Sequence, residues 1–165
     1  MPNITLYLIR HGLAGEHGSY ANDDERPLTE EGKQKTQQVA KRLHALNLRL
    51  DLIMTSPLVR AHQTADLLLE AKLSQALQVS PYLAPHGSLD QWLNWFQQER
   101  SPEVTTLALV GHEPNLSAWA ETLLWDESRG ALSLKKAGVI GLTLPEQSPV
   151  GNSALFWLTP PRFLL

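Results

Sequence analysis

The chain has no cysteine among its 165 residues, which excludes disulfide bonds, thiolate metal sites and cysteine nucleophiles. It also has no uninterrupted apolar stretch near the ~20 residues that a membrane helix needs. The amino-terminal residues MPNITLYLIRHG lack the pattern of a signal peptide, which joins a basic region, an apolar region and a small-residue cleavage site. We therefore expect a cytoplasmic protein without a membrane segment.

Neither sign of charge is in large excess. Lysine and arginine number 14 against 17 aspartates and glutamates, so the net charge is -3 and no general attraction to nucleic acid or to an anionic membrane is expected. With 42% hydrophobic residues, the chain is long enough to bury a core. We expect a single domain over residues 1–165, without internal repeats or linkers.

Hydrophobic periodicity alternates between strand-like and helix-like segments. Thr29 is the expected N-cap of the first helix, and Pro57 is expected in the first turn of the second. This order predicts an α/β fold of three layers, with a mostly parallel sheet, helices on both faces and a final antiparallel hairpin. The expected strands cover 4–10, 51–56, 77–83, 104–112, 138–144 and 153–159, and the expected helices cover 28–46, 57–71, 88–99 and 113–124.

Three strand ends carry chemically distinctive residues. The first strand ends in Arg10-His11-Gly12, the second leads through TSP into a helix with Arg60, and the fourth ends at His112. Ligands of open α/β sheets bind beyond the carboxyl ends of the strands, so we expect these residues to meet at one edge.

Two arginines and two histidines at one edge are typical of a phosphoryl site. An arginine holds two phosphate oxygens at once, and the helix that starts after His112 and Glu113 would add backbone donors. Gly12 would let the backbone approach the anion closely. The imidazole of His11 is a good nucleophile toward phosphorus when one of its ring nitrogens is unprotonated.

Four ordered motifs, LIRHG, RPLTEEG, TSPLVRAHQTA and ALVGHEPNL, resemble those of the histidine phosphatase superfamily, most closely its small SixA-type phosphohistidine phosphatases. The resemblance covers residues 4 to 125. It implies a phosphoglycerate mutase-like fold and transient phosphorylation of His11, with Arg10, Arg60 and His112 around the phosphate. It also implies that neither a metal nor another cofactor is needed.

Arg26 of the RPLTEEG motif has two possible roles. It would either reach the phosphate or hold its loop by pairing with Asp23, Asp24 or Glu25. The segment NDDER, residues 22–26, is otherwise interpreted as a solvated acidic loop.

No carboxylate stands out as a general acid, which ester hydrolysis needs to protonate the leaving alkoxide. His86 and Glu113 are the candidates nearest the expected position, and Glu16 or Asp23 could fold in from a loop. A phosphohistidine substrate needs this acid less, because its imidazole leaves as a neutral molecule once protonated. We therefore assign His86 and Glu113 to substrate binding, together with Arg26 and Gly12.

Only ~30 residues separate the TSP helix from the VGH strand, which leaves no room for a large lid. An open site suits a phosphorylated protein as substrate, for example a histidine phosphotransfer domain of a signalling system. The alternatives are a phosphomonoesterase or mutase acting on a small metabolite, and a non-catalytic phosphate-binding adaptor.

Several remaining residues are assigned by pattern alone. Trp92 and Trp119 fall on apolar helix faces and are expected in the core, whereas Trp95 and Trp125 are left open. The carboxyl-terminal PPRFLL would either pack on the domain or face a partner. The histidines expected at the surface are His17, His44 and His62.

Overall fold

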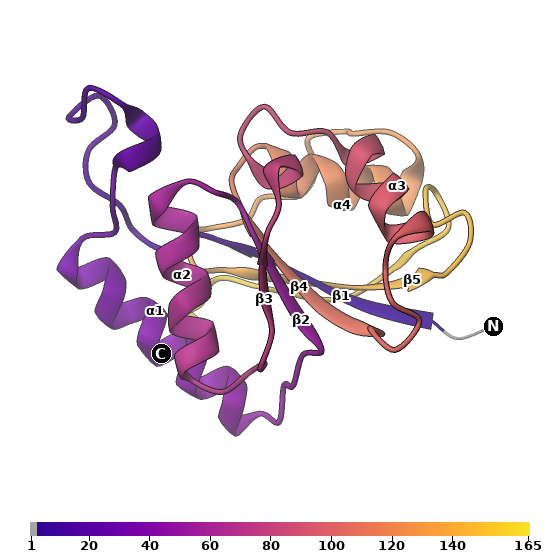
Figure 1. Cartoon of the computed structure of the whole chain (residues 1–165), viewed down its shortest axis with the longest axis horizontal. Helices are drawn as coiled ribbons and strands as arrows, with labels where there is room; N and C mark the ends of the chain where they lie inside the picture. Colours follow the sequence, from indigo (N-terminus) through magenta and orange to yellow (C-terminus); the bar gives the residue numbers. More distant parts are fainter. Residues whose placement is uncertain (1–2) are drawn as a thin grey trace.

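The computed structural model describes residues 3–165, which form one six-stranded sheet with helices on both faces (Figure 1). The strand order is β3-β2-β4-β1-β5-β6. Strands β3, β2, β4 and β1 are mutually parallel, and β5 runs antiparallel to both β1 and β6. The strands are β1 (Asn3–Arg10), β2 (Leu52–Thr55), β3 (Leu77–Val79), β4 (Thr106–Gly111), β5 (Val139–Pro145) and β6 (Ala154–Thr159).

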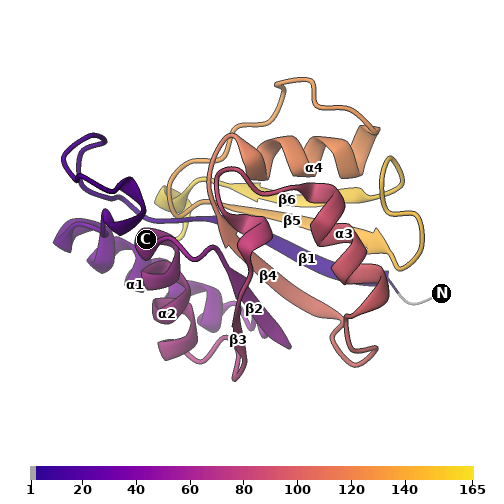
Figure 2. The same ribbon diagram turned by 45° about the horizontal axis from the view of Figure 1, so that its top comes forward.

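Two helices cover each face of the sheet, as Figure 2 shows from a second direction. Helices α1 (Glu30–Ala45) and α2 (Val59–Glu70) contribute to one apolar cluster, which includes Val39, Leu43 and Leu68. Helices α3 (Leu89–Gln98) and α4 (Asn115–Trp125) contribute to the other, which includes Trp92 and Trp119. Both clusters rest on β1, whose alternate side chains point to opposite faces.

The predicted fold class is confirmed, including the mostly parallel sheet, the helices on both faces and the final hairpin of β5 and β6. Thr29 is the N-cap of α1, since its hydroxyl accepts a hydrogen bond from the Gly32 amide at 2.9 Å. Trp95 joins the core, and Trp125 is 36% exposed.

Two boundary predictions differ from the structure. Pro57 does not open a helix, because α2 begins at Val59 and the Ser56 hydroxyl accepts the Leu58 amide in the turn before it. The short edge strand expected within 77–83 is present and is closed by Pro81 as expected, but it covers only Leu77–Val79, and a 3-10 turn follows over Pro81–Leu83.

The carboxyl-terminal residues pack on the domain. Leu164 is buried in the same cluster as Val39 and Leu43 of α1, and both views place the chain's end beside α1 (Figures 1 and 2). Phe163 and Leu165 point outward and are exposed. Within residues 3–165, every helix is too short or too polar to cross a bilayer.

Candidate active site

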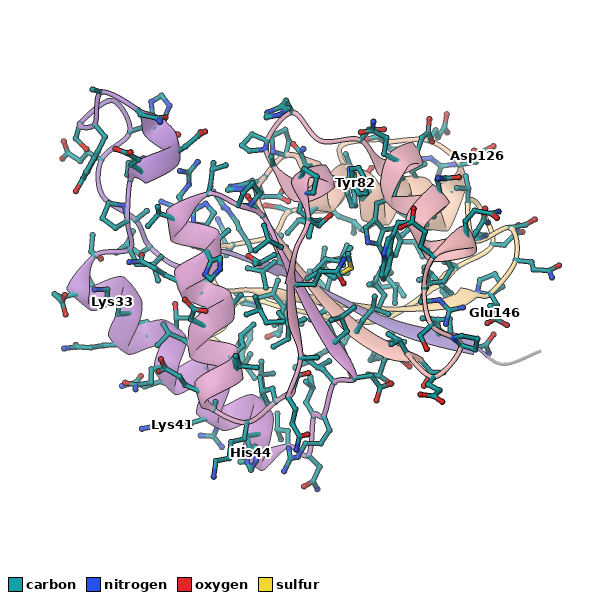
Figure 3. The ribbon with its side chains drawn as sticks, in the orientation of Figure 1. Lys33, Lys41, His44, Tyr82, Asp126 and Glu146 are labelled. Atoms are coloured by element: carbon teal, nitrogen blue, oxygen red, sulfur yellow. The ribbon has the colours of Figure 1, made fainter. Side chains whose placement is uncertain are left out.

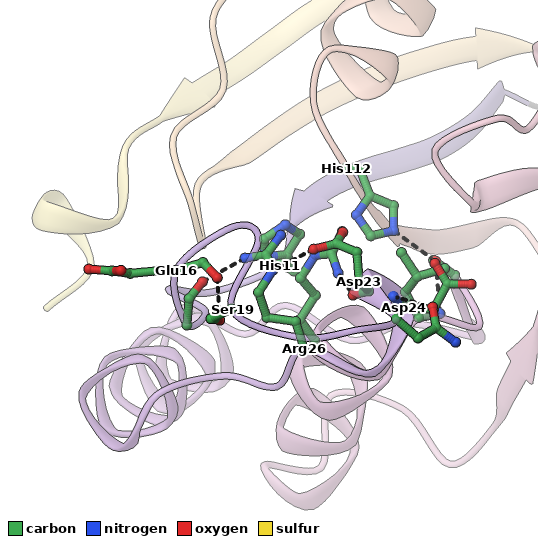
Figure 4. Close-up of polar contacts among 12 residues, drawn as sticks. His11, Glu16, Ser19, Asp23, Asp24, Arg26 and His112 are labelled. Atoms are coloured by element: carbon green, nitrogen blue, oxygen red, sulfur yellow. Dashed lines mark hydrogen bonds and ion pairs between the residues drawn. The ribbon is translucent and has the colours of Figure 1, made fainter.

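A cavity of about 590 Å³ lies at the carboxyl ends of β1 and β4, beside the start of α2. It brings together Arg10, His11, Arg26, Arg60 and His112, five of the residues predicted for the site. Figure 4 shows His11, Asp23, Arg26 and His112 gathered there. The remaining lining residues are Leu13, Ala14, Gly15, Glu16, His17, Asp23, Pro85, Glu113 and Lys136.

His11 follows directly after β1 and is held at both its backbone and its ring. Its amide donates to the Gly111 carbonyl at 3.1 Å, which continues the pairing of β1 with β4. Its Nδ1 atom lies 2.7 Å from the Gly12 carbonyl. Because a carbonyl can only accept, this contact assigns the proton to Nδ1 and leaves Nε2 with a free lone pair.

The surroundings of His11 favour the neutral ring. The pKa of His11 is lowered to about 3, mainly by burial and with smaller contributions from His112, Arg60 and Arg10, while the Gly12 carbonyl acts in the opposite direction. The two imidazoles lie close, with ring centroids 5.3 Å apart. At neutral pH, His11 is therefore unprotonated at Nε2 and available as a nucleophile.

His112 is oriented by Ser56, a residue that the sequence analysis did not select. The Nε2 atom of His112 lies 2.8 Å from the Ser56 hydroxyl, and the buried Nδ1 atom has no partner within residues 3–165. Burial, followed by Arg60 and Arg10, lowers the pKa of His112 to about 4. His112 is therefore a second neutral imidazole in the cavity wall, and Ser56 holds its orientation.

Arg10 and Arg60 bring two guanidinium groups to the cavity from opposite sides. Nη1 of Arg10 donates to the Leu134 carbonyl at 3.1 Å. Nη1 of Arg60 donates to the Asp23 carbonyl at 2.8 Å. Both Nε atoms are buried without a partner among the described residues, and burial is the main cause that lowers the pKa of each arginine. Arginines in such surroundings remain charged and favour an anionic ligand.

Asp23 joins two of these arginines. Its Oδ1 accepts Nε of Arg26 at 2.8 Å and its Oδ2 accepts Nη2 of Arg60 at 3.1 Å. Arg26 also donates to the Gly15 carbonyl at 2.8 Å. Arg26 therefore holds its loop and still lines the cavity, so both of its predicted roles are compatible with the structure.

The interpretation of residues 22–26 as a solvated acidic loop is correct for Asn22, Asp24 and Glu25, which are exposed, and wrong for Asp23 and Arg26. These residues include a 3-10 turn over Asp23–Glu25, and the Asp23 carboxylate faces Arg26 and Arg60 rather than solvent alone. The Arg26 hydrogen bond holds the pKa of Asp23 below its usual range, opposed by partial burial, so the carboxylate stays ionised.

Gly12 is required for a different reason from the one expected. Its amide donates to the Thr64 hydroxyl at 3.0 Å, and its carbonyl faces the His11 ring, so both backbone groups are engaged within the protein. A Cβ atom at this position would lie 2.2 Å from Oγ1 of Thr36. The glycine thus lets α1 approach the strand end, and it does not line the cavity.

The helix that follows His112 contributes less than expected. Glu113 caps it, because one carboxylate oxygen accepts the Ser117 amide at 2.8 Å and the other accepts the Ser117 hydroxyl at 2.6 Å. The Leu116 amide is bonded to the His112 carbonyl at 3.0 Å. These donors are therefore engaged within the chain, while Glu113 itself lines the cavity.

His86 lies outside the cavity lining. It is exposed, and its neighbour Pro85 lines the cavity in its place. His17 is exposed and lines the cavity, although it was assigned only to the surface, whereas His44 and His62 are half-buried elsewhere. His62 lies 3.0 Å from Asp66, one turn further along α2.

Sequence reasoning missed three residues of the site, namely Ser56, Thr64 and Lys136. Asp23 was named as a possible partner of Arg26 and as a residue that could fold in, but its bond to Arg60 was not expected. Ser56 lies inside the TSP motif, directly after a buried strand, and this position could have indicated it. Thr64 lies one turn after Arg60 on α2. Lys136 lies in a loop without a motif, and nothing in the sequence connects it with Arg10. Across residues 3–165, no cluster of three or more histidine, aspartate and glutamate side chains could hold a metal ion.

The fold and the paired histidines and arginines define a protein of the histidine phosphatase class. Residues 6–85 match the family model of the histidine phosphatase superfamily, branch 1. An uncharacterized protein of Picosynechococcus sp. is 44% identical over 165 residues, which cover 98% of this chain and 99% of that protein. The chain belongs to the histidine phosphatase superfamily.

Two solved structures share the fold. The protein histidine phosphatase SixA, complexed with tungstate, aligns over 98% of this chain and 100% of its own, with a TM-score of 0.84 and 24% identity. The alpha-ribazole phosphatase of Shigella flexneri aligns over 96% of this chain and 97% of its own, with a TM-score of 0.70 and 20% identity. Family membership supports a phosphatase that works through a histidine.

Proposed function

We propose that this protein removes the phosphoryl group from phosphohistidine on a partner signalling protein, through a phosphorylated His11 intermediate. The observation that carries the choice of substrate is the state of the carboxylates at the cavity. Asp23 bonds to two arginines, and Glu113 accepts two hydrogen bonds from Ser117. Neither is arranged to donate a proton to a departing alkoxide.

In the first step, Nε2 of His11 attacks phosphorus and forms a new P–N bond. The P–N bond to the substrate imidazole breaks, and that imidazole leaves as a neutral molecule because its other ring nitrogen carries the proton. Arg10 and Arg60 stabilise the negative charge on the equatorial oxygens during transfer. His112, which Ser56 holds in the cavity wall, lies beside the His11 ring during this transfer.

In the second step, water attacks the phosphorus of phospho-His11. The P–N bond breaks, Nε2 recovers its lone pair, and the oxygen and both protons of water leave as dihydrogen phosphate, which then equilibrates with solvent. The Gly12 carbonyl keeps the proton of His11 on Nδ1 throughout, so the ring returns to its starting form without a tautomer change.

The fold comparison supports the same proposal. SixA is described as a protein histidine phosphatase, and its structure holds tungstate, an analogue of phosphate. The site's buried cations and its two neutral imidazoles suit an oxyanion of this kind. The open cavity, lined by loops on one side, leaves room for a phosphorylated side chain presented by another protein.

The test compares initial rates on a phosphohistidine-bearing phosphotransfer domain and on a panel of small phosphomonoesters, with wild type and His11→Ala side by side. We expect hydrolysis of the phosphoprotein, a loss of roughly 10³-fold or more in the variant, and slow turnover of the esters. Full activity of His11→Ala under matched conditions would overturn the mechanism. Phosphate binding without turnover of any substrate would indicate an adaptor.

Hydrolysis of a small phosphomonoester is the second candidate, favoured by the shared fold of the alpha-ribazole phosphatase. It requires a proton donor. Asp23 and Glu113 are engaged in hydrogen bonds within the chain, and Glu16 lines the cavity from an exposed loop position. A high rate on one ester, lowered by Glu113→Gln or by His86→Ala, would identify that donor and replace the phosphohistidine assignment.

A further inference from the structure

A second cavity of about 530 Å³ adjoins the catalytic one. The two cavities share Arg10, Leu13 and Lys136 in their walls. Nothing in the reaction described above uses the rest of its lining, which comes from α1, from the loop before β5 and from the carboxyl-terminal segment. These further residues are Lys35, Thr36, Lys135, Ala137, Pro160, Pro161 and Arg162.

The second cavity is strongly basic. Five of its lining residues carry positive charge, and no carboxylate of residues 3–165 lines it. The whole chain has a net charge of -3, so the positive charge of this cavity does not result from an excess of basic residues in the chain. Among the described residues, Lys35 is the only one of these cations that forms an ion pair with a carboxylate, Glu31 at 3.0 Å, and that pair is exposed and therefore weak. Glu113 acts on Arg10 from the side of the catalytic cavity. The five cations are Arg10, Lys35, Lys135, Lys136 and Arg162.

Its position relative to His11 is fixed by the backbone. The Ala137 amide donates to the carbonyls of Arg10 and His11, at 3.0 and 3.2 Å. On the other side, Leu164 is buried against α1 and anchors the Pro160–Arg162 wall. The second cavity therefore has a fixed position relative to the catalytic cavity and to any ligand bound there.

Apolar surface accompanies the charge. Leu13, Ala137, Pro160 and Pro161 line the cavity between the cationic side chains. A small sugar phosphate carries hydroxyl groups over most of its surface and gains little from such walls. A peptide segment with both acidic and apolar side chains matches the cationic side chains and the apolar walls of this cavity.

We propose that the second cavity binds an acidic segment of the protein whose phosphohistidine enters the catalytic cavity. This rests on the proposed function for its substrate, and it adds the determinant by which that substrate is chosen. Lys136 lines both cavities, so one cation faces the phosphoryl group and the acidic segment together. Burial, followed by Arg10 and Arg26, lowers the pKa of Lys136, and an anion on either side would relieve this crowding of positive charge.

The first test measures binding without catalysis. A fluorescent, unphosphorylated peptide rich in glutamate and leucine is titrated with the protein, and a peptide with glutamine in place of glutamate serves as comparison. We expect the acidic peptide to bind more tightly, and binding to weaken at least about tenfold in the double variant Lys35→Glu/Arg162→Glu. Equal binding of the two peptides, or no effect of the double variant, would overturn the proposal.

The matched control is Lys41→Glu/Arg42→Glu, a double charge reversal further along α1 at two exposed residues outside both cavities; Figure 3 labels Lys41. It should leave peptide binding unchanged, which separates a local effect from the change in net charge. Thermal unfolding of all variants shows that they are folded. The binding assay needs no phosphatase activity, so it gives a result even if the proposed function is wrong.

The second test measures kinetics on phosphohistidine in two contexts. The double variant should raise KM for a phosphotransfer domain with acidic surface about tenfold, and leave kcat/KM for free phosphohistidine unchanged. An equal loss on both substrates would place these residues in the phosphoryl site and overturn the proposal. Hydrolysis of a small bisphosphate with a low KM that rises in the Lys35→Glu/Arg162→Glu variant would also overturn the proposal, because the second cavity would then bind a small molecule rather than a protein segment.

Discussion

Ser56 and His112 are joined by a hydrogen bond of 2.8 Å across 56 residues of sequence, at the point where β2 and β4 end side by side. The same serine oxygen accepts the Leu58 amide at 3.2 Å, so the turn into α2 and the imidazole are fixed by one atom. The orientation of His112 thus depends on the same turn that positions Arg60.

Ser56→Ala should therefore lower kcat on the phosphohistidine substrate by roughly 10- to 100-fold, because a misaligned His112 stabilises the transferring phosphoryl group less well. Steady-state kinetics checks this, and circular dichroism confirms that the variant is folded. The matched control is Ser80→Ala, since Ser80 is also buried and its hydroxyl has no partner within residues 3–165. An unchanged kcat in Ser56→Ala would show that the hydrogen bond has no catalytic role.

Asp23→Asn should separate phosphate affinity from catalysis. Loss of the carboxylate removes the acceptor that Arg26 and Arg60 share, so the arginines lose their alignment and kcat should fall about tenfold. Loss of a negative charge beside the cavity should also make inorganic phosphate a stronger inhibitor. Inhibition constants and kcat are measured together, and Asp24→Asn, at an exposed neighbour, is the control. Parallel changes in both aspartate variants would contradict a specific role for Asp23.

The two site histidines should titrate far below the usual range. With pKa values of about 3 for His11 and about 4 for His112, both rings stay neutral from pH 8 to about 5. NMR titration of the imidazole resonances in the ligand-free protein measures this directly. A site histidine that titrates near 6.5 would contradict the burial described here.

The same shifts link stability to pH. The unfolded chain binds protons at its histidines near pH 6.5, whereas these two folded histidines do not until near pH 3 to 4. The unfolded state therefore binds more protons in this interval, and the free energy of unfolding should fall as the pH drops from 6.5 through 4. Urea unfolding across this range tests it, and the fall should be shallower in His11→Asn.

Gly12→Ala should destabilise the protein by about 1–3 kcal/mol, because its Cβ would overlap Oγ1 of Thr36. Thr36→Ala removes that oxygen, which has no hydrogen-bond partner among the described residues, and should cost little by itself. The double variant should then recover much of the stability, a coupling that urea unfolding of all four proteins would measure. Additive losses would show that the overlap is not the cause.

Local patterns were sufficient to predict the sheet and much of the site. Arg10, His11 and His112 were predicted because each follows or ends a buried strand, and strand ends converge in this fold class. The bond between Asp23 and Arg60 was not predicted, because the sequence around Asp23 is that of a solvated acidic turn and Arg60 lies 37 residues away. The need for Gly12 likewise depends on where α1 crosses the strand end, which no local pattern encodes.

The second cavity could not be predicted from the sequence either, because it too is formed by segments that are far apart in the chain. Apart from Arg10, its cations come from α1, from the loop before β5 and from the carboxyl-terminal segment, at positions outside the four motifs. Whether PPRFLL packs or faces a partner was left open, and the structure shows both, since Leu164 is buried while Phe163 is exposed.

His11 follows β1, which among the described strands is the one with a parallel neighbour, β4, on one side and an antiparallel neighbour, β5, on the other. The cavity walls that would touch the rest of a substrate come mainly from segments outside the sheet. The reacting group and the surfaces that recognise a substrate therefore belong to separable parts of the chain. Residues 13–25, 126–137 and 160–165 could be exchanged for those of a relative without rebuilding a strand. This architecture makes the protein a suitable starting point for redirecting a phosphatase by loop grafting.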